Sequence, residues 1–207
     1  VLWGKDVDPA KPVSYADRDF FAAHRAEPGK RLFVTKPIIG RVSKKWMVAF
    51  TRSYRNADGS FAGVVSAAIP VEFFTRMLGE IKLGTQGSAV IRHVDRSLMT
   101  RYPPVDGPGG VTGEQVVSEA FARLIDSGVA QSNFHVARAP DGYERSYAFQ
   151  RISGLPYVLT VGMAPRDYLD PWYHEVRVTL GLLAALALIS IGGTFLVHQA
   201  WRQRMAA

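Results

Sequence analysis

The residues KWMVAFTRSYRNADGSFAGVVSAAIP, from Lys45 to Pro70, decide the fold class of this chain. Two runs rich in β-branched and aromatic residues, 45–55 and 61–69, flank the turn sequence NADG at 56–59, as in a β-hairpin. Pro70 ends the second strand because proline has no N–H to donate to a sheet, and VEFFTRML after it begins a helix. The stretch therefore predicts an antiparallel hairpin that leads directly into a helix.

A helix and a further strand are predicted upstream of this hairpin. Asp17–Arg25, DRDFFAAHR, reads as a short helix, and Ser14 and Asp17 stand at the spacing of a capping box, with Asp in place of the usual Glu or Gln. A strand-like run, Arg31–Pro37, follows, and Gly40 marks the turn after it. The first half of the chain thus predicts a helix, three strands and a second helix, in that order.

The same order of elements occurs a second time downstream. A predicted helix, Glu114–Asp126, carries its apolar residues on one face: Val116, Val117, Ala120, Phe121 and Leu124. Three strand-like runs follow it: Gln131–Ala139, Tyr143–Ile152 and Tyr157–Met163. The third strands of the two halves look alike, VVSAAIP against VLTVGMAP, and each leads through a proline into an amphipathic segment. The chain is therefore expected to repeat one architecture.

Each repeat is expected to open on a hairpin. In the second half, Ser88–His93 and Leu98–Tyr102 flank the turn at 94–97, whereas in the first half only Val1–Trp3 corresponds to such a hairpin. Five antiparallel strands with helices packed on them form an α+β, PAS-like layout. We therefore predict two tandem PAS-like modules, the first of them truncated at its N-terminus, followed by one transmembrane helix.

The run VTLGLLAALALISIGGTFLV, Val178–Val197, has no charged side chain. At about 1.5 Å per helical residue its twenty residues cover about 30 Å, the thickness of a bilayer's hydrocarbon core. Trp172 and Tyr173 before it and Trp201 after it suit the two headgroup regions. We expect a helix that begins near Pro165 and continues through this run across a membrane.

The basic residues beside the apolar run indicate its orientation. Arg202 and Arg204 follow it and Arg177 precedes it, so the positive-inside rule favours a cytoplasmic C-terminus. Residues 1–176 then lie outside the cytoplasm, which we expect to be the periplasmic side of a bacterial inner membrane. VLWGKDVDPAK has no apolar core of signal-peptide length, so an export signal or first span is expected upstream and an output domain downstream.

Composition sets broad limits on the function. A hydrophobic content of 47% with 21% charged residues is typical of a globular chain, and the absence of cysteine excludes disulfides and thiolate metal sites. The net charge of +7 falls to +4 without the residues after Val176, which add Arg177, Arg202 and Arg204 and no acid, and this is too small to indicate nucleic-acid binding. Eight basic residues and no acid lie between Glu27 and Asp58: Lys30, Arg31, Lys36, Arg41, Lys44, Lys45, Arg52 and Arg55. They are either solvated strand faces and turns or part of a field around a pocket for an anion.

Several of these motifs together resemble a family. SYADRDFFAAHR and KPIIGRVSKKWMVAFTRSYRNADGSFAGVVSAAIPVEFF resemble the first module of double-Cache (PDC-type) sensors of bacterial diguanylate cyclases and sensor histidine kinases. SAVIRHVDRSLMTRYP and YERSYAFQRISGLPYVLTVGMAP resemble the second module. The resemblance covers nearly all of residues 1–170 and implies a membrane-distal module at 1–82 and a membrane-proximal module at 83–170. The apolar run adds a transmembrane helix with interfacial flanks at 171–200 and the start of a cytoplasmic linker at 201–207. The resemblance also implies ligand binding in the distal module.

The resemblance points to Arg18, Phe20 and Phe21 as ligand-binding residues. They match the spacing at which amino-acid-binding members of the family carry an arginine and two aromatics. A guanidinium binds a carboxylate through two hydrogen bonds, and aromatic rings exclude water from that contact. Pro70 stands where an acid for the ligand's ammonium is expected, which favours an organic acid or other anion over an amino acid. In the structural alternative the phenylalanines are core residues and Arg18 pairs with an acid such as Asp17 or Asp19.

Other candidates carry weaker signals. Trp46 begins a strand and is suited to line a pocket or to pack in the core, and His24 is suited to donate to a ligand or to be an ordinary helix residue. Further ligand-binding candidates are Lys36, Arg41, Ser43 and Tyr54. The second module shows no comparable cluster, and its Tyr143, Tyr147 and His135 are expected to pack the sheet.

Enzyme motifs are absent from the sequence. The five histidines are far apart, with no HExxH, and there is no GxSxG, P-loop or GxGxxG. We therefore predict no catalytic residues, metal or cofactor, and interpret Gly107–Gly110 as a connector.

The leading interpretation is a ligand-sensing ectodomain that acts as a homodimer and signals through its transmembrane helix. A diguanylate cyclase or histidine kinase would be its output enzyme, carried by the rest of the protein. Two alternatives are a membrane-anchored periplasmic binding or adhesion module without output, and an anchored hydrolase.

Overall fold

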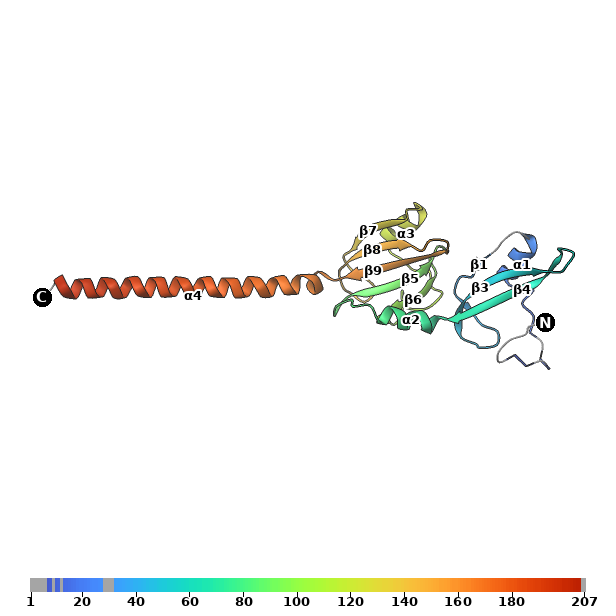
Figure 1. Cartoon of the computed structure of the whole chain (residues 1–207), viewed down its shortest axis with the longest axis horizontal. Helices are drawn as coiled ribbons and strands as arrows, with labels where there is room; N and C mark the ends of the chain where they lie inside the picture. Colours follow the sequence, from blue (N-terminus) through green and yellow to red (C-terminus); the bar gives the residue numbers. More distant parts are fainter. Residues whose placement is uncertain (1–6, 9, 12, 28–31, 206–207) are drawn as a thin grey trace. The chain divides into compact units, whose positions relative to one another are not determined.

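The computed structural model describes residues 7–8, 10–11, 13–27 and 32–205. The chain divides into two compact units, Val1–Ala164 and Pro165–Ala207. The first holds two antiparallel sheets with helices, so the fold is α+β as predicted, and the second is one long helix (Figure 1). The predicted hairpin remnant at Val1–Trp3 lies outside the described residues.

The predicted hairpin is the centre of the first sheet. β3 (Trp46–Arg55) and β4 (Phe61–Pro70) pair antiparallel, from Met47 opposite Pro70 to Arg55 opposite Phe61. Gly59 in the connecting turn has φ 84°, a left-handed conformation that glycine adopts without strain. This confirms the strands and the turn read from the sequence.

The other side of β3 pairs with two short strands, β1 (Phe33–Val34) and β2 (Ile38–Ile39). The prediction of one strand over Arg31–Pro37 is therefore wrong. Pro37 falls between the two, and its lack of an N–H breaks the ladder.

Two helices belong to this half of the unit. α2 (Val71–Gly79) begins directly after β4, as predicted. α1 (Asp19–Ala26) begins two residues later than predicted, with Arg18 as a cap residue that makes no side-chain capping bond. The predicted capping box of Ser14 and Asp17 is wrong, because the Asp17 carboxylate instead accepts hydrogen bonds from Arg41.

The second sheet has five strands in the spatial order β6-β5-β9-β8-β7. Their bounds are β5 Ser88–His93, β6 Leu98–Tyr102, β7 Gln131–Val136, β8 Arg145–Arg151 and β9 Tyr157–Met163. β5, β6 and β9 begin and end where the sequence predicts. Burial alternates along β8, so that Arg145, Tyr147 and Phe149 point into the protein and the residues between them point out.

The helix predicted at Glu114–Asp126 is shorter in the structure. α3 spans Glu119–Asp126 and begins where the Ser118 hydroxyl accepts a hydrogen bond from the backbone N–H of Phe121 at 3.3 Å. The residues before it are not helical. The carbonyl of Glu114 accepts a hydrogen bond from Leu98 N on β6 at 2.8 Å, and the side chain of Val116 is exposed. The predicted first turn of this helix is therefore wrong.

The two sheets share one hydrophobic core. Val34 and Val48 of the first sheet, Leu78 of α2 and Ile91 and Tyr157 of the second sheet belong to a single buried cluster. A second cluster, Phe121, Ile125, Phe149 and Val158, fixes α3 on the opposite face of the second sheet. Burial between the sheets therefore ties them into one unit.

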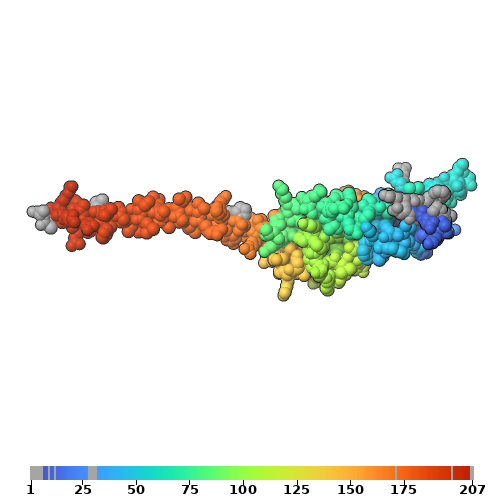
Figure 2. Space-filling model, turned by 90° about the horizontal axis from the view of Figure 1, so that it is seen from below, coloured from blue at the N-terminus to red at the C-terminus, as the bar shows by residue number. Residues whose placement is uncertain are grey.

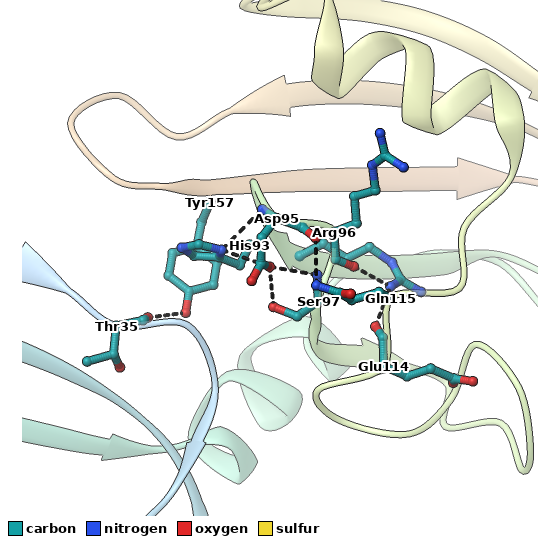
Figure 3. A network of polar contacts seen from close by, with 9 residues as sticks. Thr35, His93, Asp95, Arg96, Ser97, Glu114, Gln115 and Tyr157 are labelled. Atoms are coloured by element: carbon teal, nitrogen blue, oxygen red, sulfur yellow. Dashed lines mark hydrogen bonds and ion pairs between the residues drawn. The ribbon is translucent and has the colours of Figure 1, made fainter. Parts of the chain in front are cut away.

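A polar network also joins the sheets (Figure 3). The Tyr157 hydroxyl donates to the carbonyl of Thr35 at 2.6 Å, and the Tyr157 ring contacts His93 edge-on at 5.3 Å. His93 Nδ1 lies 2.9 Å from the Asp95 carboxylate, which also accepts from the Ser97 hydroxyl. The bond from Tyr157 spans 122 positions of sequence and fixes the second sheet to the first.

Replacing Tyr157 with phenylalanine tests how much the hydrogen bond to Thr35 contributes to stability. The ring remains in the core, but the buried Thr35 carbonyl loses its donor, so we expect the free energy of unfolding to fall by about 1–2 kcal/mol. Urea unfolding of the detergent-solubilised chain measures this, with Tyr143→Phe as the control because Tyr143 is exposed. Equal stability of both variants would mean that apolar contacts alone hold the sheets together.

The second unit is α4, Pro165–Met205, which begins where the sequence predicts. It is the one helix among the described residues that is long and apolar enough to cross a membrane. None of its most apolar 18-residue window is buried, which is not the pattern of a core helix.

Candidate functional site

Helix α1 and its N-cap residue Arg18 carry four of the predicted ligand-binding residues, and the helix lies on the first sheet. His24 is fully buried, and its Nε2 lies 3.0 Å from the Thr51 hydroxyl on β3. That hydroxyl donates its own hydrogen to the carbonyl of Phe33 at 3.0 Å, so His24 Nε2 is the donor in their contact. In the neutral ring, Nδ1 then presents a lone pair, and it has no hydrogen-bond partner among the described residues.

Arg18 stands at the other end of the same helix. Its Nη2 donates to the carbonyl of Ile39 at 3.0 Å, which fixes the guanidinium against the turn after β2. Its Nε is buried and has no acceptor within the described parts of the chain. Arg18 forms no ion pair with Asp17 or Asp19 among these residues, although its charge contributes to the lowered pKa of Asp17.

These two nitrogens are the buried side-chain atoms without partners in the described structure. An unsatisfied buried polar group costs about 1–3 kcal/mol, so such groups in native proteins call for a ligand or an ordered water. Arg18 supplies a cationic donor and His24 an acceptor. Of the two, Arg18 Nε is the group that suits an anionic ligand, because it is a buried cationic donor without an acceptor among the described residues.

The two phenylalanines of α1 contact other aromatic rings. Phe20 is buried beside the Tyr15 ring at a centroid distance of 6.2 Å, and Phe21 contacts Phe61 of β4 edge-on at 5.5 Å. Phe21 thus packs α1 against the sheet, whereas Phe20 is a buried ring that contacts the segment before α1 and lowers the polarity two residues from Arg18.

Arg41 anchors the segment before α1. It donates to both oxygens of Asp17, to the carbonyl of Ser14 and lies 5.5 Å over the Tyr15 ring. Its hydrogen bond lowers the pKa of Asp17, and the same bond raises the pKa of Arg41. Arg41 is therefore already paired with an acid and orients the residues that lead to Arg18.

The remaining predicted residues lie elsewhere. Trp46 packs against the shared core and approaches Gly113, while Lys36 and Tyr54 are exposed. Pro70 lines a hollow of about 440 Å³ at the start of α2 with Lys45, Ile69, Glu72, Phe73 and Arg76, and not the surroundings of Arg18. The described basic residues of the 30–55 segment other than Arg41 are exposed, as on solvated turns and strand faces.

Sequence reasoning missed two features. Thr51 orients His24, and nothing in the sequence marks it among the other residues of β3. In the second sheet Asp141 lies between the buried side chains of Arg101 and Arg145, where no polar cluster is predicted. The strand RSYAFQR held a signal for Arg145, because it places an arginine at the same parity as inward-facing Tyr147 and Phe149.

No group of three or more His, Cys, Asp or Glu side chains in the described ranges is arranged to hold a metal ion.

The chain is similar to several solved structures. It matches the extracellular domain of a protein described as a histidine kinase, rpHK1S-Z16, with a TM-score of 0.66 and 27% identity over 80% of this chain and 67% of that one. The periplasmic sensory domain of the Campylobacter jejuni chemoreceptor Tlp1 matches with a TM-score of 0.61 and 12% identity, over 75% and 58% of the two chains. The chain has the fold of extracytoplasmic sensor domains.

A third structure is the ligand-binding domain of the Pseudomonas fluorescens chemoreceptor CtaA in complex with L-alanine. Its TM-score is 0.53, with 17% identity over 75% of this chain and 63% of that one. The chain therefore spans from 58% to 67% of the lengths of these three structures. No family model and no curated protein matches it significantly.

Proposed function

We propose that this chain is the ligand-sensing region of a membrane-bound bacterial receptor, with its first unit outside the cytoplasm and α4 crossing the membrane. The fold shared with sensor domains of histidine kinases and chemoreceptors supports sensing. The length and apolar surface of α4 support a membrane span, and Arg202 and Arg204 favour a cytoplasmic end. A double-Cache arrangement and a kinase or diguanylate cyclase output complete the proposal.

The ligand in this proposal binds beside α1 through Arg18. The observation that carries it is the buried Nε of Arg18, which has no acceptor among the described residues. A carboxylate there would accept from a cation in a water-poor site, where such bonds are strong. An organic acid or another small anion is favoured. An amino acid is the alternative, because CtaA is solved with L-alanine and His24 Nδ1 offers an acceptor for an ammonium group.

Signal transfer requires the ligand to distinguish two states of the receptor. A ligand shifts such an equilibrium only by the difference of its affinities for the two states. The expected motion is a small slide or rotation of α4 within a homodimer. Gly181 and Ala185 form a small-xxx-small pair that would let two such helices approach closely.

A thermal-shift screen of the detergent-solubilised chain with small carboxylates and L-amino acids tests the site. At a ligand concentration a hundred times the dissociation constant, the expected stabilisation is about 2.7 kcal/mol. Arg18→Ala removes a charge-assisted hydrogen bond of about 1.5–3 kcal/mol, so we expect the dissociation constant to rise by roughly tenfold to a hundredfold.

Arg25→Ala is the matched control, because Arg25 is exposed in the last turn of the same helix. It should bind like the wild type. Equal affinity of the Arg18 and Arg25 variants would reject the site on α1, and the absence of any stabilising compound would count against a sensor of these ligands.

A further inference from the structure

A second candidate ligand site lies in the five-stranded sheet, where two buried arginines hold one carboxylate. Arg145 donates from Nη1 to Oδ1 of Asp141 at 2.6 Å and from Nη2 to Oδ2 at 2.7 Å. Arg101 donates from Nη2 to the same Oδ2 at 3.2 Å. The side chains of Arg145 and Arg101 are 1% and 4% exposed. We name these three residues the Asp141 clamp.

The two arginines of the clamp lie on strands, whereas Asp141 lies in a turn. Arg101 lies on β6 and Arg145 at the start of β8, both within the sheet. Asp141 lies in the turn between β7 and β8, which is closed by hydrogen bonds from Ala139 N to Tyr143 O and from Gly142 N to Ala139 O. The cations are therefore fixed by the sheet, and the anion reaches them from a surface turn that can move without unpairing a strand.

Positive charge exceeds negative charge around the clamp. Its own members sum to one net positive charge, and the neighbouring Arg92, 7% exposed, donates to the main-chain carbonyls of Arg96 and Glu114. Burial lowers the pKa of Arg92 to about 10, and the charge of Arg101 adds to this while the charge of Glu114 opposes it. With Arg92 and Glu114 counted, three arginines still face two acids. Buried cations in excess of buried anions favour a site that accepts a further anion.

The segment 107–113 is rich in glycine. Gly107, Gly109 and Gly113 have positive φ, and a side chain at Gly109 would clash with Pro140 of the Asp141 turn. Figure 2 shows this segment, coloured lime, at the surface of the first unit. The glycine segment therefore approaches the Asp141 turn closely at Gly109 and Pro140. Gly107 and Gly109 and the turn lie outside the strands, whereas Gly113 N donates to the carbonyl of Leu98 on β6 at 2.7 Å.

We propose that the Asp141 clamp is a binding site for a small carboxylate, and that Asp141 occupies it in the unliganded protein. A free carboxylate takes the place of the Asp141 carboxylate on Arg101 and Arg145, and the turn 139–143 moves outward. The chemistry requires only an exchange of one carboxylate for another on the same donors, so no covalent step is involved. This site is separate from the proposed site on α1.

The proposal predicts competition between Asp141 and the free ligand. In such a site the apparent dissociation constant is the intrinsic one divided by the fraction of open molecules. Asp141→Asn removes the competing charge, so we expect it to bind succinate about tenfold more tightly or better than the chain with Asp141 intact. Both are titrated in the Arg18→Ala background, which weakens the proposed site on α1 equally in both, and binding is measured by thermal shift with sodium chloride at matched ionic strength as the blank.

Asp126→Asn is the matched control for the amide substitution, because Asp126 pairs with Arg96 through two similar bonds of 2.9 and 2.8 Å on the surface. It should bind succinate no more tightly than its parent. Equal affinity of the Asp141 and Asp126 variants, or no response of either beyond the sodium chloride blank, would overturn the proposal.

Hydrogen exchange of the chain with Asp141 intact gives a second test that does not depend on the folding of a variant. Saturating succinate should speed exchange of the backbone N–H groups of Ala139 and Gly142, because their hydrogen bonds close the turn. Unchanged or slower exchange at these positions would show that the turn does not open, and would also overturn the proposal.

Discussion

The Arg145→Met chain should unfold with a free energy about 3 kcal/mol lower than that of the wild type. Methionine approximates the length of the arginine but removes both hydrogen bonds to Asp141 and leaves that carboxylate with Arg101 alone. Breaking a buried ion pair on one side is more damaging than removing it altogether, because the other charge stays in a poorly hydrated place. Urea unfolding in detergent, followed by near-UV circular dichroism, measures the change without the large helical signal of α4.

The control for this substitution is Arg123→Met. Arg123 pairs with Glu119 one turn away on α3, and both side chains are exposed, so solvent screens the pair and the change in stability should be close to zero. A loss at Arg145 no larger than at Arg123 would contradict the prediction.

Unfolding at low pH gives a second test of the ion pair between Arg145 and Asp141. Burial raises the pKa of Asp141, but the hydrogen bonds and charge of Arg145 and the charge of Arg101 outweigh it and hold the pKa below its ordinary value of 3.8. Because the folded pKa is the lower one, the unfolded chain binds more protons than the folded chain as the pH falls. The stabilisation that the ionised Asp141 gives the fold is therefore fully present above the ordinary pKa and is lost as the pH falls through the folded pKa. Below about pH 4, the wild type should therefore lose stability more steeply than Asp141→Asn.

Phe149→Ala should lower the free energy of unfolding by about 3–5 kcal/mol. Phe149 is 2% exposed at the centre of the cluster under α3, and its ring contacts Phe121 edge-on at 5.9 Å. The loss combines the transfer of the ring to water with the cavity that the strands and α3 cannot close. The same urea experiment measures it.

Phe73→Ala is the control for the phenylalanine, since Phe73 is 44% exposed on α2. It loses much less buried area and leaves no enclosed cavity, so we expect a loss of about 1 kcal/mol or less. Similar losses at both positions would mean that α3 packs more loosely on the second sheet than the structure indicates.

Local patterns predicted most of the secondary structure. β5, β6 and β9 have the predicted bounds, because each is a short apolar run between strong turn residues. The errors fall where a residue far along the chain competes for a local group. Glu114 bonds to Leu98 of β6 in place of a helical turn, and Asp17 bonds to Arg41 in place of a capping box.

The candidate sites were predictable only in part. The resemblance picked out Arg18, Phe20 and Phe21, and these lie with His24 at the N-cap and along one short helix. Trp46 was grouped with them by its residue type, but the alternation of β3 turns it towards the shared core. The prediction that Arg18 binds an anion rests on its unpaired Nε and stays a prediction until the screen is done.

The sequence alone determined the α+β class, the hairpin around residues 56–59 and the long terminal helix, since each depends on residues within a few positions of one another. Tertiary structure decided which distant polar and charged groups are paired. Arg101 and Asp141 are 40 positions apart, His24 and Thr51 are 27 apart, and Tyr157 and Thr35 are 122 apart. Such contacts depend on strand register and on the packing of sheets, and no local pattern specifies them because burial, which makes the pairing of charges necessary, exists only once the chain has folded.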